Sequence, residues 1–334
     1  MSSPRRRLIL HCGLSPGDIL MLTAAVRDLH LSNPDKFETD VRTPASELWA
    51  YNPYITRIPD TDATAERIEC HYPLINKSNQ QPYHFIHGFR KFLQDRLGVR
   101  ITTSDFRADI HLSSEEAERP SSIAIERGDS RPYWLVVSGG KLDFTAKLWG
   151  VERYQQVVDS LRDEALFVQV GSKEHYHPLL DGVVDRRGTT TREIIHLMYH
   201  AAGVLCPVTM LMHLAAAVPR IRGSRRLRPC IVIAGGREPP QWEAYPGHHF
   251  LHTIGLLDCC ADGGCWKGRV FPLGDDRHHD APSNLCEDVV GDVPHCMDMI
   301  RPSMVAELVR MCNDREDEAV YSSESRSKAA RNTP

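Results

Sequence analysis

The sequence contains no long hydrophobic run and no excess of charge of one sign, and each absence excludes a class of protein. Its longest apolar stretches, residues 204–208 and 230–234, are far shorter than the roughly 20 residues that a membrane-spanning helix requires. The 40 lysine and arginine residues are balanced by 44 aspartate and glutamate residues, which leaves a formal net charge of −4. A protein with this balance has no overall field that attracts nucleic acid or an anionic membrane. We therefore expect neither a transmembrane segment nor a nucleic-acid partner.

A secretory signal and a dinucleotide-binding fingerprint are missing as well. Arginines at 5–7 precede the apolar residues 8–10, but His11 ends that stretch early and no small-residue cleavage site follows. The loop Gly13–Asp18 contains two glycines, yet it lacks the GxGxxG spacing of dinucleotide-binding folds. We expect a cytoplasmic protein whose ten cysteines stay reduced and do not form a disulfide scaffold.

What the chain does contain is enough apolar sequence for a sizeable core. It has 334 residues, of which 41% are hydrophobic and 25% charged, a globular composition with room for about two domains of roughly 150 residues. Strand patterns and amphipathic helix patterns alternate along the chain, which is typical of parallel βαβ units. The sequence therefore predicts an α/β fold with two doubly wound domains. The predicted strands are 8–12, 38–42, 133–137, 166–170, 204–208 and 230–234, and the predicted helices are 18–30, 154–162, 192–202, 210–218 and 303–311.

The less regular segments indicate the domain boundaries. Residues 116–131 are polar, bounded by prolines and without a hydrophobic period, so we expect a linker there. We predict an N-terminal domain over 1–120 and a C-terminal domain over 121–312. The Ser-, Arg- and Glu-rich residues 313–334 predict a disordered tail. Residues 51–91 have no period and predict irregular structure facing a ligand.

The first candidate site is the loop that joins the first predicted strand to its helix. In open parallel sheets, ligands bind beyond the carboxyl ends of the strands. Gly17 lets the backbone approach a ligand closely, and the helix N-terminus offers free N–H groups to an anion. Asp18, in the first turn, has two interpretations. It is either a helix cap or a carboxylate general base.

The second candidate site follows the first strand of the predicted C-terminal domain. Residues 138–149 combine Gly139 and Gly140 with Lys141, Lys147 and several hydroxyl groups. Such a loop is suited to cradle phosphate oxygens, with lysine supplying the charge. A solvated basic loop is the alternative interpretation.

The third candidate site is the segment 207–217, in which Thr209 is placed to cap a helix whose N-terminus faces the same crevice. Met210 and Leu211 have the spacing of core residues, and His213 alone is more often an interior histidine than a catalytic one. Met212 belongs to the same helix.

Five of the ten cysteines lie close together near the C-terminus, in a segment that we delimit as 253–300. Its loops carry little core periodicity, and four thiolates from such loops form a tetrahedral site for zinc or iron. Cys259 and Cys260 are adjacent, so only one of them can bind the same ion as Cys265. A reduced structural cluster and redox chemistry are the alternatives. The candidate metal ligands are four of Cys259, Cys260, Cys265, Cys286 and Cys296.

Several short motifs follow one another over residues 7–240. They are Gly17-Asp18-Ile19-Leu20, Asn52-Pro53-Tyr54-Ile55, Lys147-Leu148-Trp149 with Tyr154, Val170-Gly171 and Thr209 with His213-Leu214-Ala215-Ala216-Ala217. Their order and spacing resemble glycosyltransferase family 9, the ADP-heptose heptosyltransferases. This resemblance implies a GT-B architecture, in which two Rossmann-like domains face each other across a cleft. The first domain would bind the acceptor and the second the nucleotide sugar.

The resemblance also implies roles for individual residues. Asp18 stands where the family has its catalytic base, and Lys147 where it has a lysine that binds the pyrophosphate. The helix that meets the donor phosphates corresponds to Thr209, Met210, Leu211, Met212 and His213, with Gly17 and Lys141 as further donor-binding candidates. No catalytic metal is expected. Related protein-modifying heptosyltransferases carry a four-cysteine iron site, which implies structural iron or zinc here, distant from the sugar chemistry.

Two departures from the family pattern leave the donor sugar open. The family usually has aspartate and glycine where this chain has Val208 and Met210. Valine removes an acceptor for sugar hydroxyls, and methionine narrows the approach to the backbone. We expect an inverting glycosyltransferase that uses a nucleotide sugar, with ADP-heptose as the first candidate.

The acceptor stays open between a hydroxyl of the lipopolysaccharide core, of a protein and of a small glycan. A non-catalytic nucleotide- or sugar-binding scaffold with a four-cysteine metal site is the main alternative, and a redox or metal sensor is another. A homo-oligomer is compatible with the sequence.

Overall fold

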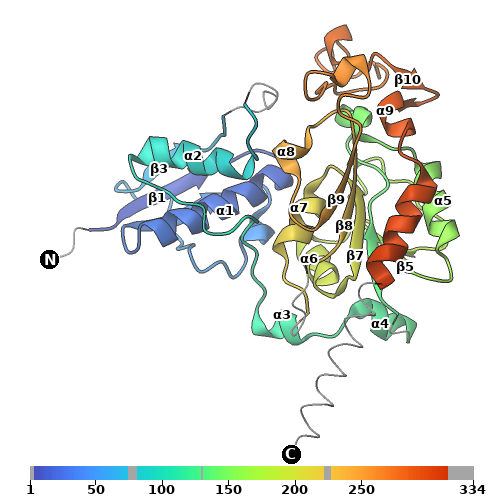
Figure 1. Cartoon of the computed structure of the whole chain (residues 1–334). Helices are drawn as coiled ribbons and strands as arrows, with labels where there is room; N and C mark the ends of the chain where they lie inside the picture. The colour runs from blue at the N-terminus through green and yellow to red at the C-terminus, as the bar shows by residue number, and fades with distance from the viewer. Residues whose placement is uncertain (1–3, 74–80, 129–130, 222–226, 315–334) are drawn as a thin grey trace, which may run out of the picture.

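The strands of the computed structural model form two parallel sheets, which lie side by side in Figure 1. The structure describes residues 4–73, 81–128, 131–221 and 227–314. The first sheet has the order β2-β1-β3, with β1 (Arg6–His11) between β2 (Phe37–Arg42) and β3 (Glu66–Glu69). The helices α1 (Pro16–Ser32) and α2 (Ile86–Leu97) pack against each other beside it.

The second sheet has the order β6-β5-β4-β7-β8-β9, and all its pairs are parallel. In chain order this is 3-2-1-4-5-6, the order of a doubly wound nucleotide-binding sheet, whose direction reverses between the first and the fourth strand. That reversal falls between β4 and β7 and leaves a crevice at their carboxyl ends. The strands are β4 (Tyr133–Val136), β5 (Leu166–Gln169), β6 (Val184–Asp185), β7 (Gly203–Pro207), β8 (Cys230–Gly235) and β9 (His248–His252).

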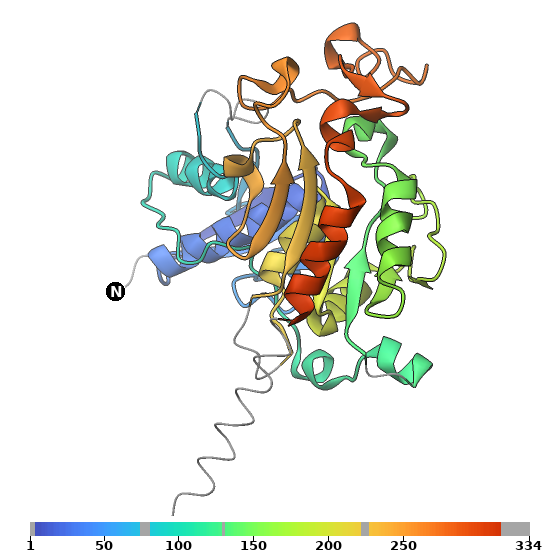
Figure 2. The same ribbon diagram turned by 45° about the vertical axis from the view of Figure 1, so that its right-hand side comes forward.

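Helices cover both faces of the second sheet, because consecutive side chains of its strands are apolar and point to opposite faces. Trp134 and Phe167 pack with α5 (Val151–Ser160) and with the helix 302–314, which run side by side in Figure 2. Leu135 and Val168 point to the other face, which α6 (Thr191–His200) and α7 (Met210–Ala217) cover. The remaining helices are α3 (Ser114–Glu118), α4 (Ser122–Arg127), α8 (Pro240–Glu243) and α9 (His295–Asp298), with the 3-10 turns η1 (Ser46–Trp49), η2 (Leu142–Lys147), η3 (Asp258–Cys260) and η4 (Pro282–Asn284) and the small antiparallel pair β10 (Val289–Val290) and β11 (Val293–Pro294).

The two halves share one hydrophobic core. A single cluster of buried side chains runs from β1 through α1 to α7 and on to the second sheet, and α1 packs directly on α7. The sequence predicts an amphipathic α1, but residues 19–29 are buried all round. The buried Arg27 is tolerated there because it donates hydrogen bonds to Asp28 and to the carbonyls of Asp105 and Arg107. The close packing of α1 on α7 brings the start of α1 to the crevice of the second sheet.

The predicted α/β architecture with parallel sheets is confirmed, and each predicted strand and helix is present to within a few residues. Besides the amphipathic character of α1, one local prediction is wrong. Residues 51–91 contain β3 and the start of α2. The expected linker holds α3 and α4, which begin where Ser113 and Ser121 cap the backbone N–H groups of Glu116 and Ala124. Most of the predicted tail, residues 315–334, lies outside the described residues.

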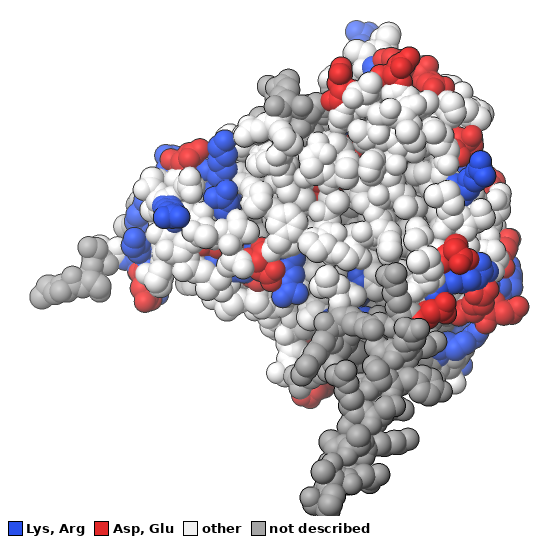
Figure 3. Space-filling model, viewed as in Figure 1, with Lys and Arg blue, Asp and Glu red and all other residues white. Residues whose placement is uncertain are grey.

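The surface agrees with the small net charge. On the face shown in Figure 3, basic and acidic side chains are interspersed around the edge, and the area between them consists mostly of uncharged residues. Within the described ranges, no helix is both long enough and apolar enough to cross a lipid bilayer.

Candidate active site

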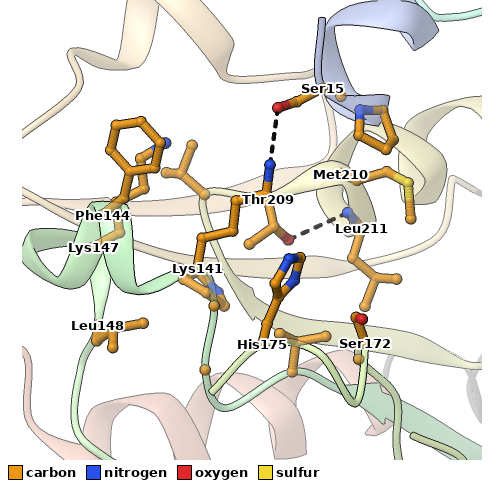
Figure 4. A pocket seen from close by; sticks show the side chains of 18 of the residues that line it. Ser15, Lys141, Phe144, Lys147, Leu148, Ser172, His175, Thr209, Met210 and Leu211 are labelled. Atoms are coloured by element: carbon orange, nitrogen blue, oxygen red, sulfur yellow. Dashed lines mark hydrogen bonds between the residues drawn. The ribbon is translucent and has the colours of Figure 1, made fainter. Parts of the chain in front are cut away.

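A cleft of about 870 Å³ lies where the carboxyl ends of the two sheets face each other. The loop before α1 forms one wall, together with Tyr72 and Phe85. The second sheet forms the other wall, and Figure 4 shows part of its lining. The loops of that second wall are 139–148, 170–177, 188–194, 207–213 and 237–243, with Trp266, Gly268, His278, His279 and Asn284 beyond them.

Asp18 points into this cleft from the first turn of α1, where it acts both as a helix cap and as a cleft residue. Its Oδ2 accepts a hydrogen bond from the backbone N–H of Ser15 at 3.1 Å, and its Oδ1 accepts one from the Tyr72 hydroxyl at 2.6 Å. Burial raises the pKa of Asp18, although the hydrogen bond from Tyr72 and the charge of Lys147 oppose the rise. A carboxylate with a raised pKa is a stronger base, which suits it to remove a proton from a hydroxyl group.

Tyr72 belongs to the site although the sequence analysis does not single it out. Its ring packs against Phe85, Phe89 and Trp242, and burial raises the pKa of its phenol. Gly88 on α2 makes room for it, because a Cβ atom at Gly88 would lie 2.6 Å from the Tyr72 Cβ. The only signal in the sequence is an aromatic residue in an irregular segment, which is too common to identify a partner of Asp18.

Lys147 lies on the opposite wall, at the end of η2. Its Nζ is 2.8 Å from Oε1 of the buried Glu238, and the same oxygen accepts a hydrogen bond from Arg237. The two cations hold the pKa of Glu238 below its usual range against the effect of burial. Both cations also lie over the ring of Phe144. Lys147 therefore places a positive charge in the cleft, and the Glu238 carboxylate is its ion-pair partner in this structure.

Lys141 crosses the cleft. Its Nζ is 3.3 Å from Oγ of Ser15, the residue that precedes α1, as Figure 4 shows. Gly17 lies beside α7, where a Cβ atom would be 3.5 Å from the His213 ring. The start of α1 therefore lies next to both segments of the other wall that are candidates for binding phosphate, the loop of Lys141 and the start of α7.

The start of α7 lines the cleft as the sequence predicts. Thr209 caps the helix, with Oγ1 accepting the N–H of Leu211 at 3.2 Å. His213 is buried, and its Nδ1 lies 2.9 Å from the Tyr245 hydroxyl. Burial lowers the pKa of His213 well below its ordinary value, so the ring is neutral. Val208, Met210 and Leu211 also line the cleft, whereas Met212 is buried in the core and is not among the lining residues.

Two buried carboxyl groups near α8, Glu238 and Glu243, are further site residues. A strand followed by Gly235–Trp242 indicates a turn at this crevice, but not which side chains enter it. Oε2 of each carboxyl is buried without a hydrogen-bond partner in the described part of the chain. Tertiary packing alone places them in the cleft.

The five candidate cysteine ligands gather beside the end of β8. A Cβ atom at Gly236 would lie 3.0 Å from the Cys260 Sγ, and one at Gly235 would lie 3.3 Å from the Cys296 Sγ, so these glycines make room for the thiols. Burial raises the pKa of Cys296 to about 12, and Cys259, Cys265 and Cys286 contribute to the rise. Among the described residues, however, no three His, Cys, Asp or Glu side chains are arranged to hold one metal ion.

The cysteine segment is not distant from the cleft. Trp266 follows Cys265 and lines the cleft. The fully buried Arg269 binds Asp280 at 2.6 Å and Asp143 of η2 at 3.4 Å. These ion pairs fold the segment over η2 and its neighbours, although none of the five cysteines is among the residues that line the cleft.

Comparisons with known proteins agree on the fold. No family model matches the chain, and no curated protein matches its sequence. Among solved structures, it is similar to TibC, an iron-containing dodecameric glycosyltransferase from enterotoxigenic E. coli H10407, with a TM-score of 0.60, 17% identity and coverage of 94% of this chain and 77% of that one.

Two further structures support the same conclusion. The E. coli ADP-heptose LPS heptosyltransferase II superimposes with a TM-score of 0.59 and 15% identity, covering 92% of this chain and 99% of that one. A family 9 glycosyltransferase from Veillonella parvula DSM 2008 superimposes with a TM-score of 0.57 and 13% identity, covering 75% of this chain and 86% of that one. The resemblance noted in the sequence is confirmed at the level of architecture: the chain has the GT-B fold of family 9 glycosyltransferases.

Proposed function

We propose that the protein is an inverting glycosyltransferase that transfers a sugar from a nucleoside diphosphate to a hydroxyl group. One observation carries the proposal. A half-buried carboxylate with a raised pKa, Asp18, faces a lysine and a capped helix N-terminus across a single cleft. The similarity to solved glycosyltransferases supports the same reaction class.

In this proposal Asp18 removes the proton of the acceptor hydroxyl. The hydroxyl oxygen forms a bond to the anomeric carbon of the donor, the bond from that carbon to the diphosphate oxygen breaks, and the nucleoside diphosphate leaves. Lys147, Lys141 and the N–H groups at the start of α7 stabilise the negative charge that develops on the leaving group. For this, Lys147 exchanges the Glu238 carboxylate for a phosphate oxygen.

For the donor we propose ADP-heptose. TibC has been solved with ADP-D-β-D-heptose, and heptosyltransferase II is named for its ADP-heptose donor. A thermal-shift titration with ADP-heptose, ADP, UDP-sugars and GDP-sugars tests the donor, because a ligand that binds only the folded state raises the melting temperature. A shift confined to ADP compounds supports ADP-heptose. A shift with UDP or GDP compounds alone contradicts it and points to Val208 and Met210 as the altered sugar pocket.

The acceptor is proposed as a hydroxyl of a glycan or a protein. One neighbour is described as an LPS heptosyltransferase, so lipopolysaccharide core is the first acceptor to assay. Incubation with radiolabelled donor, followed by separation of lipid, protein and soluble fractions, shows which class carries the label.

A non-catalytic sugar-binding scaffold is the second candidate function, and Val208 and Met210 favour it because both are apolar in the wall that would contact the sugar. In that case Asp18→Asn and Lys147→Ala leave every activity of a cell extract unchanged, whereas a transferase loses label transfer with either variant.

For the cysteine cluster we propose a structural iron or zinc ion. Four of the five thiols match the donor set that these metals take in tetrahedral sites, and TibC is described as iron-containing. The ion would hold the loops of the cysteine segment together. Metal analysis of the purified protein, with Cys286→Ser against Cys312→Ser as the control outside the cluster, tests this. Light scattering tests for a homo-oligomer, since TibC is a dodecamer.

A further inference from the structure

Glu243 is a buried carboxyl group that the proposed reaction does not use. It ends α8 and lines the cleft, and only 7% of its surface is exposed. Within the described residues its side chain has no hydrogen bond or ion pair, and Oε2 has no partner at all. A buried polar group without a partner costs folding free energy, so its presence calls for an explanation outside the folded chain itself.

Two other carboxyl groups of the cleft, those of Asp18 and Glu238, already have partners. Asp18 accepts hydrogen bonds from Ser15 and Tyr72, and Glu238 pairs with Lys147 and Arg237. Glu243 differs from both, because among the described residues neither of its carboxyl oxygens has a hydrogen bond or ion pair, so both are available to a ligand in the cleft.

The position of Glu243 indicates which part of the donor its carboxyl group would contact. Glu243 lines the same cleft as Lys147 and Asp18, and the charges of both act on its carboxyl group. In glycosyl transfer the donor sugar must lie between these two groups, since its anomeric carbon is bonded to the diphosphate and is attacked from the opposite side by the acceptor oxygen. A side chain near both therefore lies beside the sugar ring.

The protonation state of Glu243 suits a hydrogen bond with a sugar hydroxyl. Burial raises the pKa of Glu243 well above its ordinary value, and the neighbouring Glu238 adds to the rise. A neutral carboxylic acid both donates and accepts a hydrogen bond, as a sugar hydroxyl does.

We propose that the Glu243 carboxyl binds a hydroxyl group of the donor sugar and helps to determine which sugar the cleft accepts. This inference rests on the proposed glycosyl transfer. A purely structural role predicts instead that substitution of Glu243 lowers the melting temperature.

The test is a calorimetric titration of the wild type, Glu243→Met and Glu243→Gln. Each is titrated with ADP-heptose, or with whichever nucleotide sugar the wild type binds best, and with the matching nucleoside diphosphate. Glu115→Met, on the exposed surface of α3, is the matched control. We expect Glu243→Met to weaken binding of the nucleotide sugar about tenfold, the usual effect of one lost hydrogen bond, and to leave binding of the diphosphate within about twofold.

Two further results are expected. Glu243→Gln keeps the affinity within about threefold, because an amide also donates and accepts. The melting temperature of Glu243→Met equals or exceeds that of the wild type, because a buried orphan group is removed.

Each contrary result overturns the inference. If Glu243→Met weakens the binding of the nucleotide sugar and of the nucleoside diphosphate equally, Glu243 does not contact the donor sugar. The same conclusion follows if the binding of both ligands is unchanged and only the transfer is slower. Unfolding of Glu243→Met shows a structural role. Failure of the wild type itself to bind any nucleotide sugar refutes the proposed function, and this is recognised before any variant is made.

Discussion

The two walls of the cleft are built by different interactions. On the wall that carries Asp18, a single carboxylate is held by neutral donors, the Tyr72 hydroxyl and the Ser15 backbone. On the opposite wall, cations and carboxylates are paired, with Lys147 and Arg237 sharing Glu238. The first arrangement leaves a base free to take a proton. The second holds positive charge ready for an anion that can displace the carboxylate, so the difference separates proton transfer from phosphate binding.

The largest effect is expected from removing the carboxylate of Asp18, which is the proposed base. Asp18→Asn is expected to lower kcat by a factor of about 10² to 10⁴, because general base catalysis is lost. Affinity for the donor should stay within about threefold, since the phosphate wall is intact. Steady-state kinetics together with donor titration measure both quantities. The exposed Asp163→Asn is the control, and wild-type turnover in Asp18→Asn excludes Asp18 as the base.

Removing the phosphate-binding charge should act on the other wall. Lys147→Ala is expected to weaken donor binding by about one to two orders of magnitude, the effect of losing a charged hydrogen bond worth about 1.5–3 kcal/mol. It also lowers the melting temperature, because the buried Glu238 loses one of its two cations.

The double variant Lys147→Ala with Glu238→Gln separates these two effects. It should recover the melting temperature without recovering the donor affinity. Recovery of both would mean that Lys147 acts only as the partner of Glu238.

Removing the Tyr72 hydroxyl, which donates a hydrogen bond to Asp18, should have a smaller effect on kcat that depends on pH. Tyr72→Phe removes the hydrogen bond that stabilises the charged form of Asp18, so the pKa of Asp18 rises further. Since the base must be ionised, the acidic limb of the pH–rate profile moves to higher pH. We expect less than about a tenfold loss of kcat near neutral pH. A profile that moves to lower pH, or does not move, contradicts this role.

The weakest expected effect concerns the contact that joins the walls. Ser15→Ala removes the hydroxyl that Lys141 contacts across the cleft. Because the contact is single and exposed, we expect a change of about twofold or less in the KM of the donor. A much larger change in this KM would mean that the contact controls the closure of the walls.

The sequence predicts the architecture well and the partners of the site residues poorly. Strong apolar periods locate β1, α1, β4 and β7 to within a few residues, because burial of a repeating face is a local property of the chain. The strand β9 has no such signal. His248 and His249 resemble a polar loop, and only pairing with β8 makes a strand of them.

For the candidate site, the sequence predicts Asp18, Lys147 and Thr209 as residues at strand-to-helix loops, where a parallel sheet binds ligands. Tyr72 and Glu243 stand outside any motif. Their proximity to Asp18 depends on segments far apart in the chain, and no spacing rule connects them.

The sequence by itself determined the alternation of strands and helices, the absence of a long apolar run and the residue types at the three loops, because these follow from local composition and periodicity. The tertiary structure decided that the loops share one cleft, that Lys147 is paired with a buried glutamate and that Glu243 has no partner among the described residues. These properties arise when packing removes side chains from water and brings distant charges together, so they exist only in the folded chain.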